Sequence, residues 1–70
     1  MEERITVYVN GQAVEIYQGM QVKHALIALD QSLYEDAQAG RIVVEDHRGF
    51  GLGLDGAVQS GARINTNPSS

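Results

Sequence analysis

The sequence predicts an α+β fold in which a small mixed sheet of four or five strands packs on one main helix. Three observations predict it: a hairpin pattern at residues 5–17, an amphipathic pattern at 21–30, and further strand patterns after Gly40. A helix between a hairpin and later strands covers one face of the sheet. We therefore expect a single domain over residues 1–66, followed by a disordered tail at 67–70.

The opening hairpin is predicted by Asn10-Gly11, which lies between two alternating apolar segments. A type I′ turn needs φ > 0 at both central residues, and Asn-Gly is the preferred pair there. A two-residue loop then fixes the strand register, with Val9 opposite Gln12, Val7 opposite Val14, and Ile5 opposite Ile16. These aliphatic side chains share one face, the predicted core. The solvent-facing side chains are Thr6, Tyr8, Ala13, Glu15 and Tyr17.

The segment at 21–30 carries apolar residues at helical spacing, so one face should point at the core. These residues are Val22, Ala25, Leu26, Leu29 and then Leu33. No Ser, Thr, Asp or Asn precedes Val22, so we expect a poorly capped helix held by tertiary packing. A capping-box pattern from Ser32 to Glu35 predicts a second, shorter helix that ends at Gly40, with Leu33 and Ala37 facing inward.

The remaining chain predicts two or three strands. Residues 41–46 are rich in β-branched side chains, 47–49 form a turn, and 50–54 alternate Phe50, Leu52 and Leu54 with glycine. We expect Phe50 to be a core ring that anchors the sheet against the helix. After a turn at Asp55-Gly56, residues 62–66 predict a last strand with Ile64 inside.

Three segments of the chain resemble the β-grasp, or ubiquitin-like, superfamily over residues 5–65. They are Val-Asn-Gly-Gln-Ala-Val-Glu-Ile at 9–16, Gly-Met-Gln-Val at 19–22, and Asp55-Gly56 followed by Gly-Ala-Arg-Ile at 61–64. The resemblance implies a ββαβ(β)β order. Three branches are similar here: bacterial sulfur carriers for thiamine and molybdopterin synthesis, the TGS domain of RNA-linked enzymes, and the plant-type [2Fe–2S] ferredoxin domain.

The reactive groups of two of these branches have no counterpart in this sequence. Sulfur carriers of this fold act through a C-terminal Gly-Gly, whereas residues 67–70 are Asn-Pro-Ser-Ser. Ferredoxin domains hold their two irons with four cysteine thiolates, and the chain has no cysteine. The resemblance therefore implies a scaffold without that chemistry. A divergent sulfur carrier and a TGS-like RNA-associated accessory domain remain as alternatives.

The charge and apolar content of the chain limit the classes of partner that it can bind. Five Lys and Arg against nine Asp and Glu give a net charge of −4, which disfavours phosphate backbones and anionic lipid. No apolar run is long enough to span a bilayer, and the acidic N-terminus lacks a signal-peptide pattern. We expect a cytoplasmic protein that binds neither nucleic acid nor membranes.

Several short motifs suggest chemistry, and each has a plainer explanation. The pattern Gly51-x-Gly53-x-x-Gly56 lacks the following helix that a dinucleotide site needs. The segment at 48–52 begins like an RNA-binding RNP1 motif but has leucine where the second stacking ring belongs. His47 and Glu45 supply only two possible zinc ligands. No nucleophile and base can be matched, so we expect no enzyme activity, cofactor or metal.

What remains is the surface. Thr6, Tyr8 and Tyr17 are predicted to project from the solvent-facing side of the hairpin, with Arg48 nearby. Aromatic and arginine side chains are enriched where protein partners dock. The alternative is that Tyr8 only stabilises the sheet by packing across the strands on Ala13. We predict a small non-catalytic interaction or accessory module whose candidate partner surface is Thr6, Tyr8, Tyr17 and Arg48.

Overall fold

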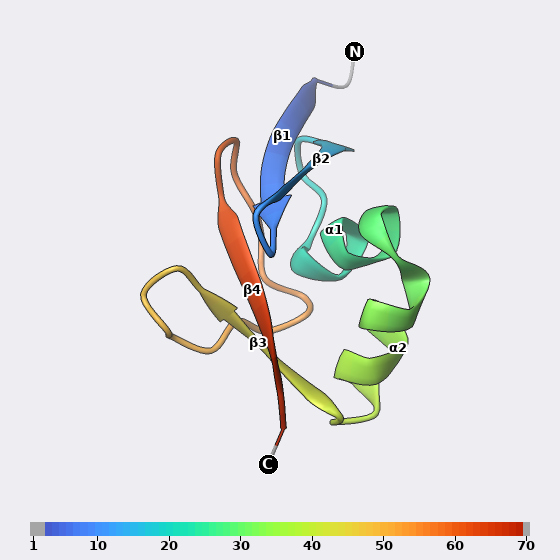
Figure 1. Ribbon diagram of the computed structural model, residues 1–70. Coiled ribbons are helices and arrows are strands. Elements are labelled where there is room, and N and C mark those ends of the chain that lie inside the picture. Colours follow the sequence, from blue (N-terminus) through green and yellow to red (C-terminus); the bar gives the residue numbers. More distant parts are fainter. Residues whose placement is uncertain (1–2, 70) are drawn as a thin grey trace.

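The computed structural model describes residues 3–69 and shows an α+β fold with a four-stranded mixed sheet and two helices (Figure 1). The elements in chain order are β1 (Arg4–Val9), β2 (Gln12–Tyr17), α1 (Val22–Leu29), α2 (Gln31–Gln38), β3 (Ile42–Asp46) and β4 (Arg63–Pro68). The sheet order is β2-β1-β4-β3. The two central strands, β1 and β4, run parallel, and each outer strand is antiparallel to its neighbour.

The hairpin prediction is confirmed in every pair. Val9 lies opposite Gln12, and the same register runs down the strands to Arg4 opposite Tyr17. Asn10 and Gly11 have φ of 53° and 83°, as a type I′ turn requires. The Asn10 side chain also reaches β4: its Nδ2 donates to Thr66 Oγ1 and its Oδ1 accepts from Thr66 N–H, both at 2.9 Å. One asparagine therefore shapes the turn and ties it to the neighbouring strand.

The core lies between the sheet and the helices, as the alternation predicted. Its buried members are Ile5, Val7, Val9, Val14, Ile16, Val22, Ala25, Leu26, Val44, Val58 and Ile64. The helix α1 packs on β1 and β2, and α2 packs on β3, so both helices cover the same side of the sheet (Figure 1). Leu33 and Ala37 of α2 pack against this core, as expected. No helix formed by residues 3–69 covers the opposite face of the sheet.

The start of α1 is better capped than the sequence predicts. His24 Nδ1 accepts a hydrogen bond from Gln21 N–H at 2.9 Å, so a histidine takes the place of the usual acidic or amide side chain. The loop at 54–56 adds two acceptors, because Val22 N–H donates to Gly56 O at 2.9 Å and Lys23 N–H to Leu54 O at 3.0 Å. The expectation of a poorly capped helix was wrong, since its partners come from a histidine and from a distant loop.

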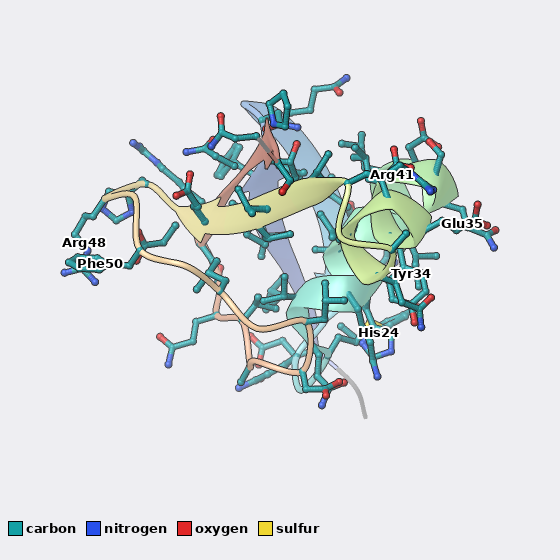
Figure 2. The ribbon with its side chains drawn as sticks, turned by 90° about the horizontal axis from the view of Figure 1, so that it is seen from below. His24, Tyr34, Glu35, Arg41, Arg48 and Phe50 are labelled. Atoms are coloured by element: carbon teal, nitrogen blue, oxygen red, sulfur yellow. The ribbon has the colours of Figure 1, made fainter. Side chains whose placement is uncertain are left out.

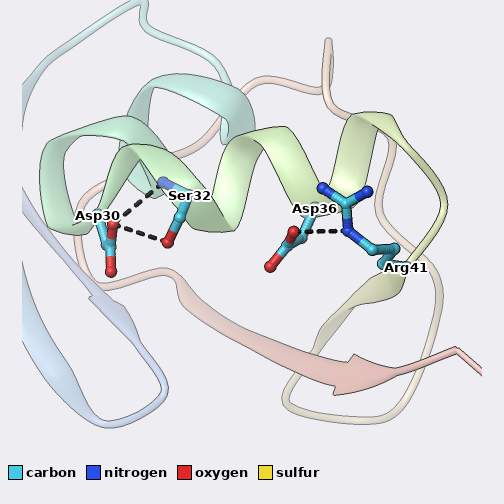
Figure 3. Close-up of polar contacts among 4 residues, drawn as sticks. All are labelled: Asp30, Ser32, Asp36 and Arg41. Carbon is cyan, nitrogen blue, oxygen red and sulfur yellow. Dashed lines mark hydrogen bonds and ion pairs between the residues drawn. The ribbon is translucent and has the colours of Figure 1, made fainter.

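The second helix begins two residues earlier than its capping-box pattern predicts. Asp30, and not Ser32, is the N-cap: its Oδ1 accepts from Ser32 N–H at 3.0 Å and from Ser32 Oγ at 2.9 Å (Figure 3). Gly40 follows the helix with φ of 82°, the left-handed conformation expected there. Beyond it, Arg41 Nε donates to Asp36 Oδ1 at 2.8 Å and closes the turn into β3 (Figure 3).

Two strand predictions differ from the structure. Residues 50–54 do not form a strand. The chain leaves β3 in a loop that returns beside it through a bridge between Glu45 and Gly51, with Asp46 N–H bonded to Phe50 O and Leu52 N–H bonded to Val44 O. Phe50 is 64% exposed, so the prediction of a core ring was wrong. The last strand also runs two residues past its predicted end at Thr66. Residues 67 and 68 pair with β3, and Ser69 N–H donates to Arg41 O, so 67–69 do not form a separate tail.

Candidate functional site

The uncovered face of the sheet carries three of the four predicted surface residues. Thr6, Tyr8 and Tyr17 alternate with core positions, so their side chains leave the sheet on the side away from the helices. Tyr8 and Tyr17 are each 40% exposed, and Thr6 is half-buried. These three side chains therefore lie on the outward face of the hairpin, as predicted.

The two tyrosines lie at opposite ends of the hairpin. Tyr8 is opposite Ala13 beside the turn, whereas Tyr17 is opposite Arg4, four residues further along β1. At about 3.3 Å per residue the two positions are ~13 Å apart along the strand. Tyr17 borders a separate apolar cavity of about 230 Å³ whose wall includes Met20 and Ile27. The structure thus brings Tyr8, but not Tyr17, towards the residues that follow β3.

The loop after β3 is held in shape by Asp46. Its Oδ1 accepts from Arg48 N–H at 2.8 Å and from Phe50 N–H at 3.0 Å, while Asp46 N–H donates to Phe50 O at 2.8 Å. Gly49, at the turn, has φ of 86° and donates its N–H to Asp46 O. The N–H of Phe50 is the main reason that the pKa of Asp46 is lowered, with smaller contributions from Arg48 and His47. One carboxylate therefore organises the whole turn.

Arg48 and Phe50 form the tip of this loop. The Arg48 guanidinium lies over the Phe50 ring at 5.4 Å from its centre, a cation–π arrangement, and also lies 3.6 Å from Asp46 Oδ2. Figure 2 shows the two side chains together at the end of the loop, on the far side of the molecule from the helices. We call Arg48 and Phe50 the loop tip. It presents a large apolar ring to solvent on an ordered backbone.

A second feature lies where the hairpin turn, β3 and β4 meet. A cavity of about 440 Å³ opens there, lined by Tyr8, Gly11, His47, Arg63 and Asn65. We call it the Arg63 hollow. It adjoins a larger cavity of about 490 Å³, which has His47 and Arg63 in its wall as well. The hollow and the loop tip are continuous along the chain, because His47 precedes Arg48.

Arg63 differs from the other cationic side chains. Four of the five Lys and Arg residues have a carboxylate within 4 Å: Arg4 has Glu15, Lys23 has Asp55, Arg41 has Asp36, and Arg48 has Asp46. Arg63 has no such partner among residues 3–69. Within the described part of the chain no carboxylate lines the Arg63 hollow either, although Asp46 lines the larger cavity beside it. The hollow is thus a locally cationic site on an acidic protein.

Sequence reasoning placed Phe50 inside the protein and gave Arg63 no part in a site. Phe50 was assigned to the core by its alternation with Leu52 and Leu54, and only the hydrogen bonds of Asp46 show why the loop turns outward. An Asp followed two residues later by Arg-Gly was the available signal, since Asp favours turns by binding nearby backbone N–H groups. Arg63 had no comparable signal, because its neighbours come from β1, the hairpin turn and the loop after β3.

The glycine motif at 51–56 does not form an anion site. Its carbonyls at Leu54 and Gly56 accept from the first N–H groups of α1, the groups that a helix N-terminus would offer to a phosphate. Gly56 is tightly placed, since a Cβ there would lie 3.1 Å from Gly53 O. Within the described chain, no three His, Asp or Glu side chains gather closely enough to hold a metal ion.

Comparison with protein-family models, curated proteins and solved structures finds no match for this chain. Among residues 3–69 neither helix has the length and apolar character needed to cross a membrane. The open sheet face, the loop tip and the Arg63 hollow are therefore the features of the molecule that bear on its function.

Proposed function

We propose that this chain is a β-grasp domain that acts without catalysis, by docking on a partner protein through the open face of its sheet. The strand order β2-β1-β4-β3, with a parallel central pair and α1 packed on the hairpin, supports the β-grasp assignment. The candidate surface is the predicted set Thr6, Tyr8, Tyr17 and Arg48, to which Phe50 is now added. Docking centres on the end of the face that holds Tyr8 and the loop tip.

The observation that carries the proposal is the exposed Phe50 ring on a loop held by Asp46. An aromatic ring that is 64% exposed forgoes most of the free energy of burial, yet four hydrogen bonds around Asp46 keep its backbone in one conformation. Such preorganisation lowers the entropy cost of binding. Aromatic and arginine side chains together are also the commonest binding hot spots. The loop tip has both.

The test is affinity capture with the whole chain as bait, read by quantitative mass spectrometry. Tyr8→Ser combined with Tyr17→Ser should abolish recovery of the partner, and Phe50→Ser alone should reduce it at least tenfold. Ile27→Ser is the matched control, since Ile27 is 41% exposed but lies on α1 beside Tyr17, at the other end of the hairpin from Tyr8. Thermal unfolding of each variant within a few degrees of the wild type would show that the fold is kept.

The single tyrosine variants locate the contact. Tyr8→Ser should weaken capture more than Tyr17→Ser, because only Tyr8 lies at the end with the loop tip. If Tyr17→Ser and Ile27→Ser weaken it instead, the apolar cavity beside β2 is the docking site and this proposal is wrong. Equal recovery with all variants would also contradict it.

A further inference from the structure

We infer that the Arg63 hollow binds a carboxylate of an acidic segment in the docked partner. This inference rests on the proposed docking function and specifies the chemistry of the partner. It starts from the pairing of charges: the other four Lys and Arg side chains each lie within 4 Å of a carboxylate of this chain, and among residues 3–69 Arg63 does not.

The lining of the hollow supplies hydrogen-bond donors without a competing anion. The Arg63 guanidinium has N–H groups in a planar fork that fits a carboxylate, the Asn65 amide and Tyr8 hydroxyl can donate further bonds, and His47 completes the wall. Two carboxylates end β3 beside the hollow. Asp46 is occupied by the loop backbone and by Arg48, and Glu45, opposite Asn65, accepts a hydrogen bond from Asn67 Nδ2. An incoming carboxylate would therefore meet Arg63 with no acidic side chain of the hollow opposing it.

The surroundings favour an acidic peptide over a phosphate-rich polymer. A net charge of −4 repels a ligand more strongly the more negative charges it carries, so a long phosphate polymer is opposed more than a short peptide, whose carboxylate also meets the local attraction of one guanidinium. The hollow also lies between Tyr8 and the residues leading to Phe50. An extended segment crossing this end of the sheet can place an apolar side chain against the rings and an acidic one at Arg63.

The experiment is a titration of the ¹⁵N-labelled whole chain, followed by backbone amide chemical shifts. The probes are an acetylated, amidated tetraglutamate, the matching tetraglutamine, and inorganic phosphate. Tetraglutamate should produce saturable shifts at residues 8, 11, 47, 63 and 65, with a Kd on the order of ten millimolar, as expected for one charge-assisted contact. Raising the salt concentration should weaken these shifts, and tetraglutamine should not produce them.

Two substitutions assign the effect to Arg63. Arg63→Gln should weaken tetraglutamate binding about tenfold or more, and Arg63→Lys should give an intermediate loss because it keeps the charge but not the planar fork. The matched control is Arg41→Gln, since Arg41 is also exposed but is paired with Asp36 at the end of α2. It should bind tetraglutamate as the wild type does. Because Arg63 is exposed, well-dispersed amide spectra of its variants are expected.

The outcomes separate this inference from the docking proposal. Unlocalised shifts, equal shifts with tetraglutamine, or unchanged binding in Arg63→Gln would overturn the inference. Phosphate binding more tightly than tetraglutamate at the same amides would also overturn it, because the hollow would then be a phosphate site. If the inference fails in one of these ways but partner capture still depends on Phe50, the docking proposal stands. Conversely, Arg63-dependent shifts without Phe50-dependent capture would support the hollow and contradict docking.

Discussion

Replacing Phe50 with alanine should barely change the free energy of unfolding, although it removes the largest apolar side chain in the second half of the chain. Phe50 is 64% exposed, so only about a third of its surface is removed from water. Full burial of a phenylalanine side chain is worth about 1.5–3 kcal/mol. A third of that is about 0.5–1 kcal/mol, an upper limit because the Arg48 guanidinium over the ring accounts for part of the covered surface.

Leu26→Ala is the matched contrast. Leu26 lies on the inner side of α1 and is fully buried, and truncating a buried leucine to alanine costs about 2–5 kcal/mol in lost burial and residual cavity. At about 0.05–0.15 kcal/mol per residue, a chain of 70 residues has a total stability of about 4–10 kcal/mol. Leu26→Ala should therefore remove a large part of it, and Phe50→Ala very little.

Urea unfolding followed by far-ultraviolet circular dichroism measures both changes. The dependence of the free energy on urea should stay the same for wild type and Phe50→Ala, so that the shift in midpoint reports stability directly. A loss above about 2 kcal/mol in Phe50→Ala would mean that the ring is buried and that the loop tip is not a free surface. A loss below about 1 kcal/mol in Leu26→Ala would mean that the core is placed wrongly.

Three further predictions test the polar contacts. Asn10→Gly, which keeps the turn geometry but loses both hydrogen bonds to Thr66, should cost about 1 kcal/mol in urea unfolding, and an unchanged midpoint would contradict the contact. His24→Ala should cost about 0.5–1 kcal/mol through loss of the α1 cap, whereas His24→Asn, which retains an acceptor, should recover part of it. Folding lowers the pKa of Asp46, so its carboxylate stabilises the folded protein at pH values above the unfolded pKa, and this stabilisation is lost as the pH falls. Asp46→Asn should therefore flatten the decline in unfolding free energy between about pH 5 and pH 2. A parallel decline in the wild type and the variant would refute this.

Whether the exposure of a candidate residue could be predicted depended on which contacts decide it. Thr6, Tyr8 and Tyr17 were predicted correctly as outward-facing, because one turn and a period of two decide the face of every hairpin residue. Phe50 was predicted to be inside, because the alternation at 50–54 takes no account of hydrogen bonds from a preceding side chain. Asp46 binds the N–H groups of Arg48 and Phe50, and this turns the loop outward.

By itself the sequence determined the hairpin register, the inward faces of both helices, and the glycine that ends α2, since each depends on residues within a few positions of one another. The tertiary structure alone decided what surrounds Arg63. Parallel pairing of β1 with β4, and antiparallel pairing of β4 with β3, bring Tyr8 and His47 to it from distant parts of the chain. No local pattern encodes such a meeting, because it follows from how the strands are ordered around a shared core.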